Sequence, residues 1–266
     1  MKRIKLTVSY DGTNYAGWQI QKNALAVEQV LNEHLSRLLN EDIAVIGASR
    51  TDSGVHALGN VAVFDTETRI PAEKISFALN QSLPDDIRIA LSQEVSSDFY
   101  PRKEKCVKTY RYNILNCRYN IPSVRLYSDY VYYPMDLEKM KEAAKCLEGE
   151  HDFIGFSSSG GQQKTTVRTI YSLKIDQKPL NITQPSGGLS PAMISMTVKG
   201  NGFLYNMVRI IAGTLEKVAV GAYPPEYVKQ ILDSHSRILQ TAKAPARGLT
   251  LVSIEYPDEP PAQTIV

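Results

Sequence analysis

The stretch YPRKEKCVKTYRYNIL (residues 100–115) divides the chain and decides how its fold is interpreted. Its first part is strongly basic, and from Lys108 onward tyrosines recur in a β-rich run. Such a run predicts a strand over residues 108–115. We expect this strand to begin the second of two halves, which meet near residues 103–107.

The residues before this stretch have patterns typical of a β-α-β-β-α-β unit. Apolar residues at helical spacing predict a helix from Val27 to Leu39. A second helix is expected from Pro71, a residue that suits the first helical position, to about Asn80. Strands are expected over residues 3–10, 43–47, 60–68 and 85–95. This order is that of a ferredoxin-like unit.

The residues after the basic stretch nearly repeat the pattern. Strands are expected over residues 108–115, 128–134, 167–176, 192–200 and 249–256, and helices over 136–147, over 204–220 and from Pro224. The Pro- and Gly-rich residues 178–190 predict a loop, and the polar tail 258–266 predicts a loose end. The sequence therefore predicts an α+β fold of two ferredoxin-like or RRM-like halves with antiparallel sheets, over residues 1–104 and 105–266.

Composition narrows the class of protein. The chain has 266 residues, 43% hydrophobic and 22% charged, with a net charge of +2, which is ordinary for a soluble globular protein. No apolar run approaches the roughly 18 residues of a membrane helix, and the N-terminus lacks the apolar stretch of a signal peptide, so a cytoplasmic protein is expected. Cys106, Cys117 and Cys146 form no CxxC pair, so we expect free thiols and no metal site.

The motif ASRTDSGVHALGN (residues 48–60) places a candidate acid in a bend after the 43–47 run. A cation near Asp52 would keep its carboxylate ionised, and such a group can act as nucleophile or base. The alternative is that Asp52 caps a turn. Gly54 can supply a backbone conformation that other residues resist. His56 has no apparent third metal ligand nearby, so a structural role is predicted for it.

A second candidate charge is Arg209, in the expected helix FLYNMVRIIAGTLEKVAV (residues 203–220). Apolar residues occupy one stripe of this helix and Arg209 lies off it, so much of the helix is expected to be buried. An arginine in that setting favours a carboxylate or phosphate partner. The alternative is an arginine that extends from the core into solvent.

The basic stretch is a candidate RNA-binding surface. Cations such as Arg102 and Lys108 bind a phosphate backbone, and unstacked bases stack on aromatic rings. In the 108–114 strand Lys108, Tyr110 and Tyr112 are expected on one face, where Tyr110 could contact a base. The alternatives are a solvated linker for the basic stretch and a core position for Tyr110. The loop SSSGGQQK (residues 157–164) could contact phosphates, but a mobile loop is the simpler interpretation.

Together these motifs resemble the tRNA pseudouridine synthase A family. SRTDSGVHALGNVAVF resembles the R-T-D-A-G-V-H-A motif of that family, and FYPRKEKCVKTYRYNI resembles its F-x-x-R-x-x-A-x-x-K-T-Y-R-Y segment. GNGFLYNMVRIIAGTL and APARGLTLVSIEY are similar to its later helix and strand, and YDGTNYAGWQIQ to its first loop. The motifs occur in family order from residue 8 to about 256. Ser53 and Cys106 stand where alanine is usual, and neither change removes a functional group.

The resemblance implies an isomerase that converts uridine to pseudouridine at positions 38–40 of the tRNA anticodon stem-loop, without cofactor or metal. The uracil is cut from its ribose at N1, turned, and rejoined through C5. Base flipping would bring the target into a central cleft between the halves. By resemblance Asp52 is the catalytic aspartate, which could add to the base, bond the sugar or remove a proton from it.

The resemblance also implies roles for other residues and a homodimeric state. Arg209 would pair with Asp52, and Tyr110 would lie on the uracil and take part in the final proton removal. Arg50 would help to hold the flipped nucleotide, and Leu249 would line the pocket. Two other interpretations remain: an RNA-binding protein without activity, and a small-molecule lyase or hydrolase, which would need no basic aromatic segment.

Overall fold

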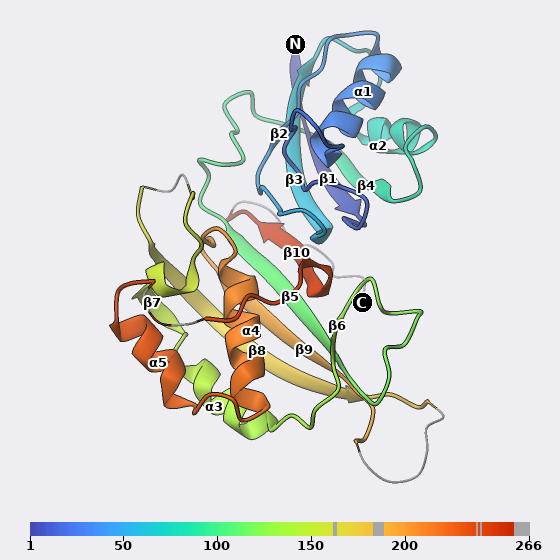
Figure 1. Cartoon of the computed structure of the whole chain (residues 1–266). Coiled ribbons are helices and arrows are strands. Elements are labelled where there is room, and N and C mark those ends of the chain that lie inside the picture. The colour runs from blue at the N-terminus through green and yellow to red at the C-terminus, as the bar shows by residue number, and fades with distance from the viewer. Residues whose placement is uncertain (162–163, 183–188, 238, 240, 258–266) are drawn as a thin grey trace. The chain divides into compact units, whose positions relative to one another are not determined.

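The computed structural model describes residues 1–161, 164–182, 189–237, 239 and 241–257. The chain forms two compact units (Figure 1): unit 1 comprises Met1–Cys106 with Thr250–Val266, and unit 2 comprises Val107–Leu249. The chain therefore leaves unit 1 within the basic stretch and returns to it at its last strand.

Unit 1 contains the predicted β-α-β-β-α-β order. Its elements are β1 (Lys2–Tyr10), α1 (Val27–Leu39), β2 (Ile46–Gly47), β3 (His56–Thr66), α2 (Ala72–Asn80) and β4 (Ile87–Val95), followed at the end of the chain by β10 (Leu249–Glu255). β1 pairs antiparallel with β3 and β4, and β2 pairs antiparallel with β3. β10 pairs in parallel with β3, through Thr250 opposite His56 and Leu251 opposite Ala57.

The core of unit 1 lies between this sheet and its two helices. Val27, Val30, Leu31 and Leu35 form the buried stripe of α1, as their spacing predicts. The helix ends at Asn40, which adopts the left-handed conformation (φ 53°) common at helix C-termini. Pro71 lies one residue before α2, at its N-cap.

Unit 2 is a second α+β unit, with helix α4 (Met207–Ala219) drawn in front of strands β8 and β9 in Figure 1. It contains β5 (Val107–Asn116), β6 (Asp129–Val131), α3 (Leu137–Lys145), β7 (Gly149–Asp152), β8 (Val167–Pro179), β9 (Ala192–Gly200), α4 (Met207–Ala219) and α5 (Glu226–Asp233), with short 3₁₀ turns at Ile154–Phe156 and Ala246–Gly248. The strand order is β5-β9-β8-β7, all antiparallel, and β6 pairs in parallel with β5.

Several boundaries differ from those predicted. β2 and β6 are shorter than the expected strands over residues 43–47 and 128–134. β7 was not expected, because its sequence GEHD has neither alternation nor β-branched residues. α4 begins at Met207 rather than residue 204, because Asn206 has a positive φ of 60° and interrupts the helical backbone.

The unit to which the last strand belongs also differs from the predicted division of the chain into halves. The sequence places residues 105–266 in one half, whereas β10 pairs with β3 of unit 1. Spacing along the chain does not identify a strand's neighbour, so this pairing was not accessible from the sequence. The tail 258–266 and parts of the predicted loops 157–164 and 178–190 lie outside the described residues. Within the described part of the chain, no helix has the length and apolar character needed to span a bilayer.

Candidate functional site

Asp52 lies in the turn between β2 and β3, and its side chain is half-buried. The Val55 amide donates to the Asp52 carbonyl oxygen at 3.1 Å, and Gly54 adopts a φ of +76° within the turn. That left-handed conformation favours glycine. The sequence motif is thus a tight turn that presents a carboxylate partly accessible to solvent.

A loop over residues 11–18 contacts this turn through its backbone. The Thr51 carbonyl oxygen accepts a hydrogen bond from Trp18 N (3.1 Å), and the Tyr15 carbonyl oxygen accepts from Gly54 N (3.3 Å). Gly17 has a φ of +95°, and a Cβ there would collide with the Thr51 carbonyl oxygen. Only glycine allows the two backbones to approach this closely, so the 11–18 loop fixes the residues on both sides of Asp52.

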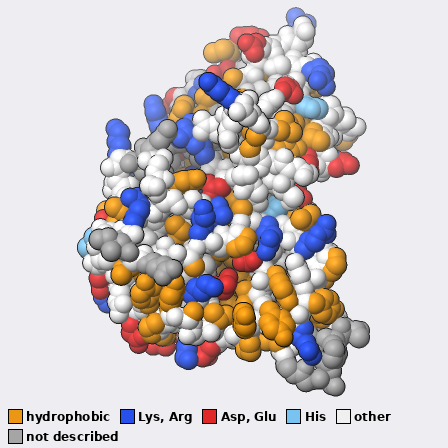
Figure 2. Space-filling model, in the orientation of Figure 1, with side chains coloured by type: hydrophobic (Ala, Val, Ile, Leu, Met, Phe, Trp, Pro, Cys, Tyr) orange, Lys and Arg blue, Asp and Glu red, His pale blue; other side chains and the backbone are white. Residues whose placement is uncertain are grey.

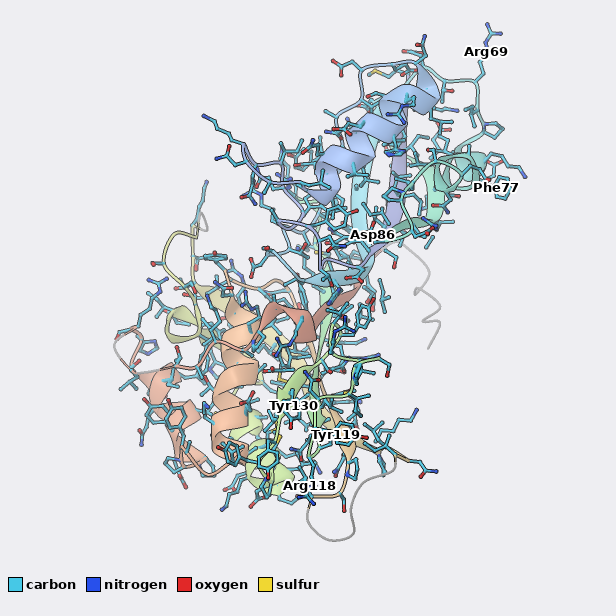
Figure 3. The ribbon with its side chains drawn as sticks, turned by 45° about the vertical axis from the view of Figure 1, so that its right-hand side comes forward. Arg69, Phe77, Asp86, Arg118, Tyr119 and Tyr130 are labelled. Atoms are coloured by element: carbon cyan, nitrogen blue, oxygen red, sulfur yellow. The ribbon has the colours of Figure 1, made fainter. Side chains whose placement is uncertain are left out.

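Side chains from the sheet and from the 11–18 loop form further hydrogen bonds in the same region. Tyr10 Oη lies 2.7 Å from Thr51 Oγ1, and Asn60 Nδ2 donates to the Ser49 carbonyl oxygen at 3.1 Å. Tyr15 Oη donates to Asp86 Oδ1 at 2.6 Å; Figure 3 labels Asp86, just before β4. Burial, followed by this hydrogen bond, raises the pKa of Tyr15, so its hydroxyl remains a donor. The Asp52 turn is therefore fixed by several independent contacts.

His56 has a structural environment, as predicted. It is 4% exposed at the start of β3, and its Nδ1 accepts a hydrogen bond from Gly12 N at 3.1 Å. Asp11 Oδ1 also lies 3.1 Å from Nδ1. These contacts join His56 to the 11–18 loop.

The arginines of unit 1 have different surroundings. Arg50 is exposed, two residues before Asp52. Arg102 is also exposed, but its Nε donates to the Gly47 carbonyl oxygen at 2.7 Å. Arg102 thus has a structural contact with β2 in addition to any role toward a substrate.

In unit 2 the two tyrosines of β5 differ in surroundings. Tyr110 is 7% exposed and packs edge-on against Phe203, with ring centroids 5.2 Å apart. Tyr112 is fully buried, and its hydroxyl lies 3.2 Å from Asp129 Oδ2 and 3.0 Å from the Pro245 carbonyl oxygen. Lys108 is half-buried at the start of the same strand.

Arg209 lies on the first turn of α4 and is half-buried. Its Nε donates to the Ala244 carbonyl oxygen and its Nη1 to Asn206 Oδ1, both at 2.9 Å. The Ala244 amide donates in return to the Arg209 carbonyl oxygen at 3.0 Å. Leu249 is 5% exposed. Asp52 belongs to unit 1 and Arg209 to unit 2, so their pairing stays a prediction.

Sequence reasoning did not identify a charged cluster in unit 2. Asp129, only 6% exposed, forms an ion pair with Arg247 through Oδ1 at 3.1 Å. Burial, followed by the nearby negative charge of Asp129, raises the pKa of Glu216 on α4 to about 7. No spacing in the sequence connects these three positions. Among the residues that the structure describes, no group of His, Cys, Asp and Glu side chains could hold a metal ion.

Comparisons with known proteins point to one family. A family model described as tRNA pseudouridine synthase matches residues 6–102 and 143–257. A protein named tRNA pseudouridine synthase A from Thermoanaerobacter sp. (strain X514) is 43% identical over 256 residues, 96% of this chain and 100% of that protein. A protein of the same name from Ruminiclostridium cellulolyticum (strain ATCC 35319 / DSM 5812 / JCM 6584 / H10) is 46% identical over the same shares.

Among solved structures, the archaeal box H/ACA sRNP Nop10-Cbf5 complex matches with a TM-score of 0.32 and 11% identity, over 86% of this chain and 53% of that one. A similarity this weak supports no inference about fold or function.

Proposed function

This chain belongs to the tRNA pseudouridine synthase family, whose members isomerise uridine in tRNA, and from that premise we propose that its targets are positions 38–40 of the anticodon stem-loop. The reaction breaks the N1–C1′ bond and forms a C5–C1′ bond. A proton leaves C5 and N1 gains one, so atoms balance without a cofactor. The protein must expose the base, provide an ionised group and limit access of water.

Asp52 is the catalytic carboxylate in this proposal. The observation that supports it most is the turn: backbone contacts from the 11–18 loop fix the chain on both sides of a half-buried aspartate. A group held in one position loses little freedom when the substrate binds, which favours the reaction. A turn cap alone would not require the close approach at Gly17.

Arg209 pairs with Asp52 in the working enzyme, and its known contacts support such a role. The acceptors at Ala244 and Asn206 hold the guanidinium in one orientation. A guanidinium has five N–H donors and binds carboxylates well. A paired arginine would keep a half-buried aspartate negatively charged, because an opposite charge favours the ionised form.

The remaining residues bind RNA. Removing a base from its stack costs a few kcal/mol, which contacts to the flipped nucleotide must offset. Tyr110 contacts the uracil, Leu249 lines its pocket and Arg50 holds the flipped nucleotide; Lys108 and Arg102 contact phosphates. Lys and Arg side chains are spread over the face drawn in Figure 2, which suits a phosphate backbone. The enzyme acts in the cytoplasm as a homodimer. Sedimentation of the purified protein would test the dimeric state.

The experiment for this function uses unmodified tRNA transcripts with uridine at position 38, 39 or 40 alone. We expect pseudouridine at these positions and none in a transcript with cytidine at all three. Binding without any pseudouridine would support the non-catalytic RNA-binding protein instead. Pseudouridine only outside the stem-loop would reject the proposed site but not the enzyme class.

Arg209→Ala tests the proposed pair. We expect kcat to fall by about a hundredfold, because removing one partner of a partly buried ion pair in the site costs about 3 kcal/mol. The Kd for tRNA should change little. Lys217→Ala removes a charge from the same helix and is the matched control. A loss confined to tRNA binding would mean that Arg209 contacts phosphate rather than Asp52.

A further inference from the structure

The carbonyl oxygen of Tyr15 contacts the two residues that follow Asp52 in the turn. It accepts a hydrogen bond from Gly54 N at 3.3 Å and another from Ser53 Oγ at 3.2 Å. A carbonyl oxygen has two lone pairs, so this one acceptor can satisfy both donors. Ser53 stands where alanine is usual in the family, and alanine could not form the second bond. The direction of the Asp52 side chain therefore depends on where this oxygen lies.

The acceptor is needed because the turn contains a residue with unusual conformational freedom. Gly54 has a φ of +76°, and glycine has more accessible backbone conformations than any other residue. Ser53 is exposed and Gly54 is half-buried, so packing alone does not fix this part of the chain. A fixed acceptor restricts the backbone that follows Asp52.

Asp86 anchors Tyr15 through its side chain and its backbone. Tyr15 Oη donates to Asp86 Oδ1 at 2.6 Å, a length typical of a hydroxyl that donates to a carboxylate. The Asp86 carbonyl oxygen accepts from Asp11 N at 2.9 Å, and Tyr15 N donates to the Gly12 carbonyl oxygen at 3.1 Å. Asp86, which directly precedes β4 and is labelled in Figure 3, thus contacts both ends of the 11–15 loop.

The Tyr15 hydroxyl is a permanent donor in this arrangement. The residue is 4% exposed, and burial, followed by the hydrogen bond to Asp86, raises the pKa of the hydroxyl. It therefore keeps its proton, and its bond to Asp86, throughout the neutral pH range. The effect of removing this bond should accordingly be the same at each pH in that range.

From these contacts we infer that Tyr15 is a positioning residue: Asp86 anchors its ring, and its carbonyl oxygen holds Ser53 and Gly54 so that Asp52 points in one direction. The inference rests on the proposed role of Asp52 in catalysis. Tyr15 and Asp86 act through the turn and not on the substrate, so their loss should lower kcat and leave tRNA binding intact.

The first test is pseudouridine formation by Tyr15→Phe on an unmodified tRNA transcript. Phenylalanine keeps the ring and removes only the bond to Asp86. We expect kcat to fall about tenfold with KM nearly unchanged, because a small displacement of a catalytic group slows the reaction without weakening substrate binding. Tyr171→Phe, at an exposed tyrosine of unit 2, is the control and should keep wild-type activity. An unchanged kcat for Tyr15→Phe, or a loss confined to KM, would overturn the inference.

Variants of Asp86 test the anchor itself. Asp86→Ala should lower kcat about as much as Tyr15→Phe, and the double variant should lose no more than either single variant, because both changes remove the same bond. Asp86→Asn keeps an acceptor oxygen and should regain most of the activity. Asp85→Ala, at the exposed neighbouring position, should match the wild type. Losses that multiply in the double variant would mean that Tyr15 and Asp86 act independently, which contradicts the anchor.

Ser53→Ala removes the second donor to the Tyr15 carbonyl oxygen and leaves the core unchanged. We expect kcat to fall about threefold with KM nearly unchanged, the effect of a hydrogen bond at the low end of the usual range. This variant keeps the inference testable if the Tyr15 and Asp86 variants do not fold. A wild-type kcat for Ser53→Ala would count against the role of the carbonyl oxygen.

Hydrogen exchange of the free protein, measured by NMR, separates this inference from the proposed function. The Gly54 amide, which donates to Tyr15, should exchange about tenfold faster in Tyr15→Phe and Asp86→Ala than in the wild type. The Ala48 amide, which donates to the Val61 carbonyl oxygen at 2.7 Å, should exchange equally in all three proteins. If the wild type makes no pseudouridine but Gly54 exchanges faster in both variants, the anchor stands and only the proposed function fails. Equal Gly54 exchange in all three proteins would overturn the inference whatever the activity.

Discussion

At the scale of single residues, backbone contacts from the 11–18 loop fix the turn that contains Asp52. The bend that contains Asp52 was predictable from a motif that places Arg50, Asp52, Gly54 and His56 close together, whereas the catalytic role of Asp52 stays a prediction. The contacts that hold the bend were not predictable, because Gly17 and Tyr15 belong to a loop whose approach to Thr51 has no signature in spacing. The ion pair of Asp129 and Arg247 was missed for the same reason, since the two residues are distant in sequence.

Gly17→Ala tests the close approach of the two loops. We expect a loss of roughly 1–3 kcal/mol in the free energy of unfolding, because alanine is strained at φ +95° and its Cβ would collide with Thr51. Gly221→Ala is the matched control: its φ is +81° with no atom within 4 Å of the added Cβ. Urea unfolding of both variants measures the difference. Equal losses would mean that backbone strain alone, without the contact, explains the effect.

At the scale of elements, unit 1 depends on register between β1 and β3. Arg3 Nε and Nη2 donate to Asp65 Oδ1 (2.8 Å) and Oδ2 (2.7 Å), where Arg3 and Asp65 are opposite each other. The hydrogen bond from Arg3 is the main cause that lowers the pKa of Asp65. A two-pronged ion pair of this kind favours one register over a slipped one.

Asp65→Asn should reduce the free energy of unfolding by about 1 kcal/mol at neutral pH, the modest value suited to a partly exposed pair. Because the folded pKa of Asp65 is depressed, this stability is present above the unfolded value of 3.8 and is lost as the pH falls through the lower folded value. The difference in the free energy of unfolding between wild type and variant should therefore disappear in acid. Asp85→Asn, at an exposed pair with Arg88, should change nothing measurable. A gap independent of pH would contradict the account.

The sequence was informative where elements are long and periodic. β1, α1 and β9 lie where alternation or helical spacing placed them. It was less informative where a single backbone feature sets a boundary, as at Asn206 before α4. Short strands such as β6 and β7 form because a neighbouring strand provides partners, which is a tertiary effect that local pattern cannot reveal.

At the scale of the whole molecule, the return of the chain to unit 1 is the main feature. β10 pairs with β3, and Tyr256 packs on Phe99 with ring centroids 5.1 Å apart and donates to the Pro101 carbonyl oxygen at 3.2 Å. Lys5 Nζ lies 5.7 Å from the centre of the Tyr256 ring. The last strand thus belongs structurally with the first hundred residues, although its sequence follows unit 2.

Tyr256→Ala should destabilise unit 1 by about 3 kcal/mol, the usual loss when a large buried aromatic side chain is truncated. Tyr256→Phe should cost only about 1 kcal/mol, because it removes the hydrogen bond and keeps the ring. Trp18 is fully buried in unit 1 and is the one tryptophan of the sequence, so its fluorescence reports this transition. Similar small losses for both variants would mean that β10 contributes little to unit 1.

The most direct test of the central claim is pseudouridine formation by Asp52→Asn on an unmodified tRNA transcript. Asparagine preserves the shape of the side chain and removes its charge, and Asp85→Asn is the control for loss of an exposed acid. We predict that the Asp52 variant binds tRNA with a wild-type Kd and loses kcat by roughly a thousandfold or more, while the control stays active. Full activity of Asp52→Asn would contradict the assignment of Asp52 as the catalytic residue.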